Sequence, residues 1–299
     1  MSTATTDTSK TALVFFHAQT PLHPGSGTAL GVVDLPVQRE RHTQWPTIPG
    51  SSIKGVFRDA CRGRAPNGAC TAVFGPETAE ADKHAGALSV TDARILAFPV
   101  RSVRGVFAYA TSRAVLQRLR RDTALTGDPA DIPIPPPPAE GAAYCATDSP
   151  LRIDADHVVL EEFDLLAGTC DTWDQLAGRL ATWISEDEEV RQEFRTRLIL
   201  LDDDQFTHFV RHGTEVVARI GLDYERKTVR TGALFYQEYL PAETMLYSIV
   251  IASSARDGSG KSAGDVMNFL KSNIPPVLQF GGDETIGKGF CHVHFATDR

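Results

Sequence analysis

Hydrophobic and polar positions along this chain follow two periods, one typical of strands and one typical of helices. Residues 11–18 (TALVFFHA) are almost continuously apolar and predict a buried opening strand. Residues 51–62 repeat apolar side chains at i, i+3 and i+4, which predicts a helix that follows Pro49 and is capped by Ser51 or Ser52. The chain therefore opens with a strand and a helix separated by a long loop.

The same two periods predict strands and helices along the rest of the chain. Strands are expected at 215–221, 229–239 and 245–252, one or two strands at 87–100, and an extended stretch at 152–166. Helices are expected at 112–122, 172–197 and 262–272, and a closing hairpin at 277–295. The polar segment 222–228 joins two of the strands as a long hairpin, and the proline-rich segment 132–141 excludes regular structure. A strand–helix–strand unit near each end fits an α+β ferredoxin-like sheet with large insertions.

No change of composition marks a boundary within residues 11–299, so we expect a single domain. Its insertions are expected at about 124–212 and its projecting hairpin at about 213–236. Residues 1–10 are polar and threonine-rich, which predicts a flexible tail and not a signal peptide.

The composition is that of an ordinary globular protein, with 42% hydrophobic and 23% charged residues. No apolar run reaches the roughly 18 to 20 residues that a membrane-spanning helix needs, so we expect no membrane partner. The five cysteines are scattered without the spacing of zinc ligands. Free thiols in a reducing, cytoplasmic compartment are therefore expected.

Charge is distributed unevenly along the chain, although its net value is −8. Residues 39–64 contain six Arg or Lys against two acids, residues 101–121 contain six Arg and no acid, and acids gather between 148 and 204. One basic face on an acidic body can bind a nucleic acid, because local potential governs binding more than net charge does. Two solvated basic faces would give the same pattern, and charge alone does not separate these interpretations.

The first predicted helix carries a candidate phosphate-binding stripe. Lys54, Arg58 and Arg62 recur at every fourth residue and therefore share one face. The unpaired N–H groups of the first turn add an anion site at the same end. A glycine-rich loop ahead of this helix carries His23 and Asp34, so a carboxylate can lie near a bound phosphate backbone.

Five segments carry a resemblance to a known family. They are LHPGSG (22–27), GVVDLPVQRERH (31–42), IPGSSIKGVFR (48–58), GALFYQEYLP (232–241) and QFGGDETIGKGF (279–290). The chain resembles the RAMP superfamily of CRISPR proteins, and most closely the repeated backbone subunit of type III-B (Cmr-type) effector complexes. The segments occur in the expected order over nearly the whole chain, whereas residues 124–212 contribute little.

The resemblance implies a fold and a set of partners. The fold is a modified ferredoxin-like (RRM-like) palm with an extended β-hairpin thumb. Several copies of the chain would assemble with other subunits of the type III-B complex along a guide RNA, and each thumb would kink the duplex of guide and target RNA. Base pairing between guide and target, not protein side chains, would read the sequence.

The resemblance also implies an endoribonuclease activity centred on Asp34. An aspartate in the matching loop of this family is needed for metal-dependent cutting of target RNA beside each kink, and Mg²⁺ or Mn²⁺ is the expected metal. The 2′-hydroxyl of the RNA would attack the adjacent phosphate and leave a cyclic phosphate. A loop carboxylate can act as base or hold the metal, although a lone loop aspartate is more often an exposed turn residue.

Auxiliary catalytic residues are expected in two further segments. His23 is a candidate acid or phosphate contact, with a packed loop histidine as the alternative. Glu238 and Tyr239 lie where the family carries auxiliary catalytic residues. A shift of one position in that segment would put Gln237 in the place of the carboxylate.

Contacts to guide RNA are expected from polar and cationic side chains, and from glycines that allow the backbone to approach closely. The expected contacts are Arg39, Arg41, Ser51, Ser52, Lys54, Arg58, Arg219, Lys227, Arg230, Gly281, Gly282, Gly287, Lys288 and Gly289. The same glycines would also suit a hairpin turn that needs positive φ.

Two alternative functions stay open. The chain would be a non-catalytic guide-RNA-binding subunit if another subunit cuts the target. It would be an NTP-binding protein if Gly260-Lys261-Ser262, which follows a strand and precedes a helix, forms a P-loop. Ala255 in place of the first glycine, and only 37 residues after Ser262, argue against the second alternative.

Overall fold

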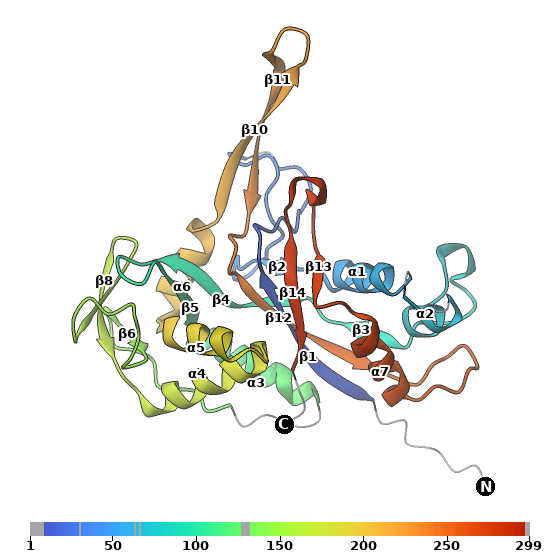
Figure 1. The fold of residues 1–299 in the computed structure, drawn as a ribbon, viewed down its shortest axis with the longest axis horizontal. Helices are drawn as coiled ribbons and strands as arrows, with labels where there is room; N and C mark the ends of the chain where they lie inside the picture. Colours follow the sequence, from blue (N-terminus) through green and yellow to red (C-terminus); the bar gives the residue numbers. More distant parts are fainter. Residues whose placement is uncertain (1–8, 30, 63, 66, 127–131, 297–299) are drawn as a thin grey trace.

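Four antiparallel strands form the centre of the fold, and they come from both ends of the chain (Figure 1). Their spatial order is β14 (Phe290–Phe295), β1 (Lys10–Ala18), β12 (Met245–Ala252) and β4 (Ala93–Arg101). The structure is a computed structural model that describes residues 9–29, 31–62, 64–65, 67–126 and 132–296.

The connections between these four strands follow a regular pattern. In chain order the strands are β1, β4, β12 and β14, with α1 (Gly50–Arg62) between the first two and α7 (Ala263–Asn273) between the last two. The shorter elements β2 (Thr47–Ile48), α2 (Asn67–Phe74), β3 (Leu88–Val90) and β13 (Val277–Gln279) complete this half. The strand-and-helix order is therefore strand, helix, strand, strand, helix, strand, with the shorter elements and the insertion between them.

β1 is buried on both faces because it separates two hydrophobic cores. Val14 and Phe16 belong to the core that includes Phe57 of α1 and Leu270 of α7. The alternate side chain Phe15 belongs to the other core, which is built with the middle of the chain. Successive side chains of a strand point to opposite faces, which explains why this segment is apolar at nearly every position.

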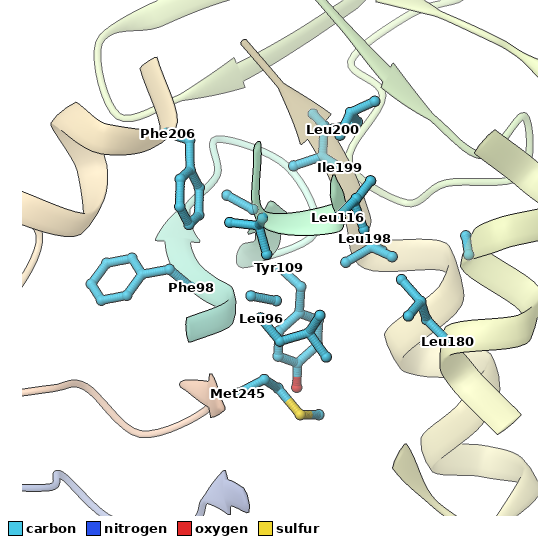
Figure 2. Packing of buried hydrophobic residues seen from close by; sticks show 14 of the residues in the cluster. Leu96, Phe98, Tyr109, Leu116, Leu180, Leu198, Ile199, Leu200, Phe206 and Met245 are labelled. Carbon is cyan, nitrogen blue, oxygen red and sulfur yellow. The ribbon is translucent and has the colours of Figure 1, made fainter. Parts of the chain in front are cut away.

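The middle of the chain extends the sheet beyond β4. The added strands are, in spatial order, β5 (Phe107–Ser112), β9 (Leu198–Leu201), β6 (Ala142–Cys145), β8 (Phe163–Gly168) and β7 (His157–Leu160). Four helices pack here: α3 (Arg113–Thr123), α4 (Asp171–Ile184), α5 (Glu188–Arg197) and α6 (Asp203–His212). Figure 2 shows part of the resulting core, with Phe98, Leu180 and Ile199 among its labelled side chains.

A two-stranded ribbon projects from the body (Figure 1). It consists of β10 (Glu215–Asp223) paired antiparallel with β11 (Thr228–Tyr239). Most of its apolar side chains are exposed, including Val216, Ile220 and Leu234. Among the described residues, β10 and β11 form a sheet of their own. This ribbon is the predicted hairpin: β10 runs two residues beyond the expected end at 221, and β11 begins one residue before 229 and ends at Tyr239 as expected.

Most of the predicted elements are confirmed, including the strand at 245–252, which the structure reproduces residue for residue. The helix predicted at 172–197 is wrong as one element, because it is broken at Ser185 and restarts where the Asp187 carboxylate accepts the Glu189 and Val190 N–H groups. Capping by Ser51 or Ser52 is also wrong, since α1 already begins at Gly50, whose N–H donates to Asp92. Short elements at 107–112, 142–145 and 203–212 were not predicted.

The first strand begins inside the predicted N-terminal tail. Residues 1–8 of the predicted tail lie outside the described residues, and Lys10 belongs to β1. The single-domain interpretation stays a prediction, with one hydrogen-bonded sheet running from β13 to β7. In the part of the chain that the structure describes, no helix has the length and apolar character needed to cross a membrane.

Replacing Phe57 by Ala is expected to lower the free energy of unfolding by about 3–5 kcal/mol, because the cavity cannot collapse fully. Phe57 is fully buried and packs against Phe16, Phe280 and Phe295. Urea denaturation measures the loss. The matched control Val32→Ala, at a side chain that is 91% exposed, is expected to stay within about 0.5 kcal/mol. A Phe57→Ala variant as stable as the control would contradict the assignment of this core.

Candidate functional site

The loop after β1 returns along the base of the hairpin. Leu22 and Leu240 form an antiparallel bridge, and Leu35 bridges Gln237 in parallel orientation. Gly25 pairs with Val37 within the loop itself. The β13–β14 turn is attached to the same loop, because the Gly282 N–H donates to the His23 carbonyl. Four of the five segments that carry the resemblance therefore contact one another.

Asp34 lies beside β11 through its own side chain. Its Oδ2 accepts a hydrogen bond from the Tyr236 N–H at 2.7 Å, and the next residue, Leu35, donates its N–H to the Tyr236 carbonyl at 3.0 Å. The side chain is partly exposed, and its other oxygen has no hydrogen-bond partner among the described residues. The backbone therefore fixes the carboxylate in place while one oxygen stays available.

Glu238 is buried and its carboxylate is fully occupied. It accepts hydrogen bonds from the Val37 N–H at 2.9 Å, the Arg39 guanidinium at 2.6 Å and the Thr214 hydroxyl at 2.8 Å. The Arg39 side chain is only 15% exposed and also donates to the Gln44 and Val210 carbonyls. These two residues, expected at a catalytic and an RNA-binding position, form an internal ion pair that fastens the loop to β11.

His23 is packed inside the same junction. Its Nδ1 lies 2.6 Å from the Glu238 carbonyl, and its ring centre is 5.5 Å from that of Tyr239. Only 7% of the residue is exposed. His23 thus lies next to the expected catalytic segment. It is packed in the loop, as in the alternative interpretation of this residue.

A second carboxylate, which sequence analysis did not single out, collects side chains on the opposite face of β11. Asp283 accepts hydrogen bonds from Arg219 at 2.6 Å, from the Gln237 amide at 2.6 Å and from the Tyr239 hydroxyl at 2.9 Å. Arg219 also donates to the Gln237 oxygen at 2.6 Å. We call Arg219, Gln237, Tyr239 and Asp283 the Asp283 network.

The Asp283 network holds its members in defined protonation states. Burial would raise the pKa of Asp283, but hydrogen bonds from Arg219 and Tyr239 hold that pKa below its ordinary value. Burial, together with the hydrogen bond to Asp283, raises the pKa of Tyr239 to about 12. The aspartate is therefore an anion and the tyrosine a neutral donor near pH 7. Lys288 adds a cation 5.1 Å from the Tyr239 ring centre.

The glycines of the β13–β14 turn have conformational and steric reasons to be glycine. Gly281 has a φ of 76°, and a Cβ there would lie 2.2 Å from the His23 carbonyl oxygen. Gly289 has a φ of 80°, and its Cβ would meet the Phe280 carbonyl at 2.0 Å. Gly281, Gly282 and Gly287 are exposed. Glycines that the turn requires would therefore also allow RNA to approach the backbone closely.

The cationic side chains of α1 were expected to be free to bind phosphate, but Lys54 and Arg58 are bonded within the protein. Lys54 donates to the Leu88 carbonyl at 2.8 Å, and Arg58 donates to the Gly75 carbonyl at 3.0 Å and pairs with Glu77. Burial, with help from the nearby Arg58 charge, lowers the pKa of Lys54. The two side chains share one face as predicted, but that face packs against the protein's own carbonyls. A phosphate would have to displace these contacts.

Other expected RNA contacts are exposed. Ser51 and Ser52 lie on the outer side of the first turn of α1, and Arg41 is exposed in the loop after β1. Lys227 and Arg230 are exposed near the tip of the hairpin. Arg219 is instead held in the Asp283 network at the hairpin base, so the structure separates these cations into free and engaged ones.

The donor set near Asp34 fits a metal only together with a substrate. Among the described residues there is no group of three His, Cys, Asp or Glu side chains that could hold an ion. Mg²⁺ is commonly held by one or two carboxylates, with water and substrate phosphates completing its six positions. Asp34 could supply one such carboxylate, which fits an ion that arrives with RNA and not one resident in the protein.

The strand–loop–helix at 245–273 does not form a nucleotide-binding P-loop. β12 is antiparallel to its neighbours β1, β3 and β4, whereas such a loop follows a strand of a parallel sheet. Ser262 caps α7 in a reciprocal pair with Asp265. The resemblance of Gly260-Lys261-Ser262 to a phosphate loop therefore comes from an ordinary helix cap.

Comparison with known proteins gives one consistent family. The family model described as the RAMP superfamily matches residues 15–292. The chain is 39% identical, over 95% of both lengths, to the CRISPR system Cmr endoribonuclease Cmr4 of Pyrococcus furiosus. A crystal structure of oligomeric Cmr4 from the same organism superposes with a TM-score of 0.76 at 30% identity, covering 97% of this chain and 99% of that one.

A more distant structure agrees in fold. A subunit of the type III-B Cmr-beta complex bound to cognate target RNA superposes with a TM-score of 0.73 at 22% identity, covering 95% of this chain and 96% of that one. The large mixed sheet of this chain and its projecting β10–β11 hairpin match the solved Cmr4 structures. With a matching family model over most of its length and a 39% identical relative, this chain belongs to the RAMP superfamily and, within it, to the Cmr4 proteins.

Proposed function

We propose that this chain is a backbone subunit of a type III-B CRISPR effector complex that binds guide RNA in several copies and cuts complementary target RNA at regular intervals. The 39% identical Cmr4 protein of Pyrococcus furiosus is an endoribonuclease by name, and a crystal structure shows Cmr4 from that organism as an oligomer. The partners are guide RNA, target RNA, further copies of the chain and the other subunits of the complex.

One observation carries this proposal: the segments that resemble the family meet at a single place. The Asp34 loop, β11 and the β13–β14 turn are joined by the Leu35–Gln237 bridge and by the Asp283 network. These segments are far apart in sequence, and only the fold brings them together. A partly exposed carboxylate, an exposed glycine-rich turn and a projecting ribbon are thereby all attached to β11.

The fold in this proposal is a modified ferredoxin-like palm with a thumb. The order β14-β1-β12-β4 and the two helices between successive strands are those of a β-α-β-β-α-β unit. β10 and β11 would be the thumb, with exposed apolar side chains at Val216, Ile220 and Leu234 available to separate stacked nucleotides.

Asp34 supplies the chemistry of cutting in this proposal. Cleavage by the RNA's own 2′-hydroxyl needs that hydroxyl deprotonated and the phosphate charge offset. The Asp34 oxygen that Tyr236 leaves unoccupied can accept the proton or hold a divalent cation that offsets the phosphate charge. The products would be a cyclic phosphate and a free 5′-hydroxyl.

Asp34→Asn is expected to lower the rate of target cutting at least about 100-fold, because the amide neither accepts the proton nor holds a cation well. The amide keeps the shape of the side chain and its contact with Tyr236. The measurement is single-turnover cleavage by the assembled complex, with guide-RNA binding followed in parallel and expected to be unchanged.

The matched control is Asp82→Asn, at an exposed aspartate away from the site, which is expected to cut normally. Normal cutting by Asp34→Asn would assign the activity to another subunit. The chain would then be the structural guide-RNA-binding subunit, which is the second candidate function.

Chelation of divalent cations is expected to stop cutting without loosening the protein. EDTA should abolish cleavage, and added Mg²⁺ or Mn²⁺ should restore it. The thermal unfolding midpoint of the RNA-free chain should not move, because the described residues hold no three-ligand metal group. Undiminished cleavage in EDTA would instead favour Asp34 as a base that needs no metal.

Glu238→Gln is expected to destabilise the protein by about 3 kcal/mol, because it leaves the Arg39 guanidinium, which is only 15% exposed, facing an amide. Urea denaturation measures the change, with Glu225→Gln at the exposed hairpin tip as the matched control. At equal amounts of assembled complex, Glu238→Gln should cut far better than Asp34→Asn. Full stability with abolished cutting would make Glu238 a catalytic residue.

A further inference from the structure

Asp283 occupies a backbone conformation that non-glycine residues rarely adopt. Its φ is 67°, in the left-handed region, and it lies in a turn whose Gly281 and Gly287 have φ values of 76° and 78°. Asparagine and aspartate are among the few residues that tolerate this region, at a cost in free energy. Interactions of the carboxylate can offset this cost.

The compensating interaction is the convergence of three donors on one carboxylate. Oδ1 accepts from Arg219 of β10, and Oδ2 accepts from Gln237 and Tyr239 of β11. The Asp283 side chain is 17% exposed, so little water competes with these contacts. Both strands of the hairpin are thereby fastened to the turn that follows β13.

An acidic side chain in this turn would repel an approaching phosphate if it were unpaired. Arg219 lies 2.6 Å from Asp283 and offsets its charge, and Lys288 lies over the Tyr239 ring, 5.1 Å from its centre. The network is therefore close to neutral or cationic overall. Its carboxylate can brace the turn without excluding RNA.

We propose that Asp283 is a positioning residue for RNA cutting, which fixes the glycine-rich turn and the hairpin base relative to the Asp34 loop through Arg219, Gln237 and Tyr239. This inference rests on the proposed function. The strand that carries Gln237 also pairs with Leu35, the neighbour of Asp34, so the brace and the catalytic loop share β11. Loosening the brace changes where a bound RNA lies against Asp34.

The network also defines what Tyr239 does. Its hydroxyl donates its proton to Asp283 at 2.9 Å, and Arg219 donates to the hydroxyl oxygen at 3.3 Å. The tyrosine is thus held neutral with its proton directed at the aspartate and away from any substrate. In this arrangement Tyr239 orients the site and does not abstract a proton.

The test compares Asp283→Gly and Asp283→Asn in the assembled complex with guide RNA. Glycine removes the carboxylate and relieves the left-handed backbone, so this variant isolates the loss of the brace. We expect the maximal single-turnover cutting rate of Asp283→Gly to fall at least about 10-fold, with Asp283→Asn in between, because small displacements of a reacting group are costly. The dissociation constant for guide RNA is expected to stay within about twofold.

The matched control is Glu284→Gln, which removes an acidic charge from the exposed neighbouring position of the same turn and is expected to cut normally. If Asp283→Gly cuts at the wild-type rate while Asp34→Asn is inactive, Asp283 is not a positioning residue. If Asp283→Gly loses guide binding in proportion to cutting, its role is in binding or folding, which also overturns the inference. If Asp34→Asn cuts normally, the proposed function itself fails.

A second readout does not depend on activity. Carbon-13 NMR of labelled tyrosine in the full chain follows the ionisation of Tyr239, whose signal is assigned with Tyr239→Phe. Asp283→Asn is expected to lower the pKa of Tyr239 from about 12, because it removes the anion that opposes ionisation, while Glu284→Gln leaves it unchanged. An unchanged pKa in Asp283→Asn would show that the tyrosine is not bonded to Asp283.

Discussion

The pairing of the Asp34 loop with strand β11 is the contact on which the rest of the site depends. Residues 34–37 run beside β11, held by one bridge and by hydrogen bonds of the Leu35, Tyr236 and Glu238 backbone groups. β11 is at the same time one strand of the projecting ribbon. A single strand therefore sets the position of the candidate catalytic carboxylate and of the thumb, so neither can move far without the other.

Two carboxylates stabilise this junction from opposite faces of β11. Glu238 points to one face and binds Val37 and Arg39, while Gln237 and Tyr239 point to the other face and bind Asp283. Alternation of side chains along a strand makes this division possible. The N-terminal loop and the glycine-rich C-terminal turn are thereby attached to one backbone. Residues expected to contact RNA at this junction thus serve first to build the surface on which RNA would lie.

The sequence predicted the elements whose periodicity is long and unbroken, such as α1, β12 and the β10–β11 hairpin. It did not predict β5, β6 or α6, because runs of four to ten residues carry too little periodic signal in an insertion. The residue types of the site were predictable only through the family resemblance. Their partners were not, because contacts such as Val37 with Glu238 join positions separated by 201 residues. Asp283 could not be predicted for the same reason, because its partners Arg219, Gln237 and Tyr239 are 44 to 64 residues away in sequence.

The most direct measurement is an electron cryo-microscopy structure of the assembled complex carrying Asp34→Asn with guide RNA and uncut target RNA. Our account predicts a target phosphodiester lying between the side chain at position 34 and the turn of residues 281–289, within about 4 Å of that side chain, as in-line attack on a positioned phosphate requires. A target strand that passes on the face of β11 that carries Glu238, or far from position 34, would contradict it.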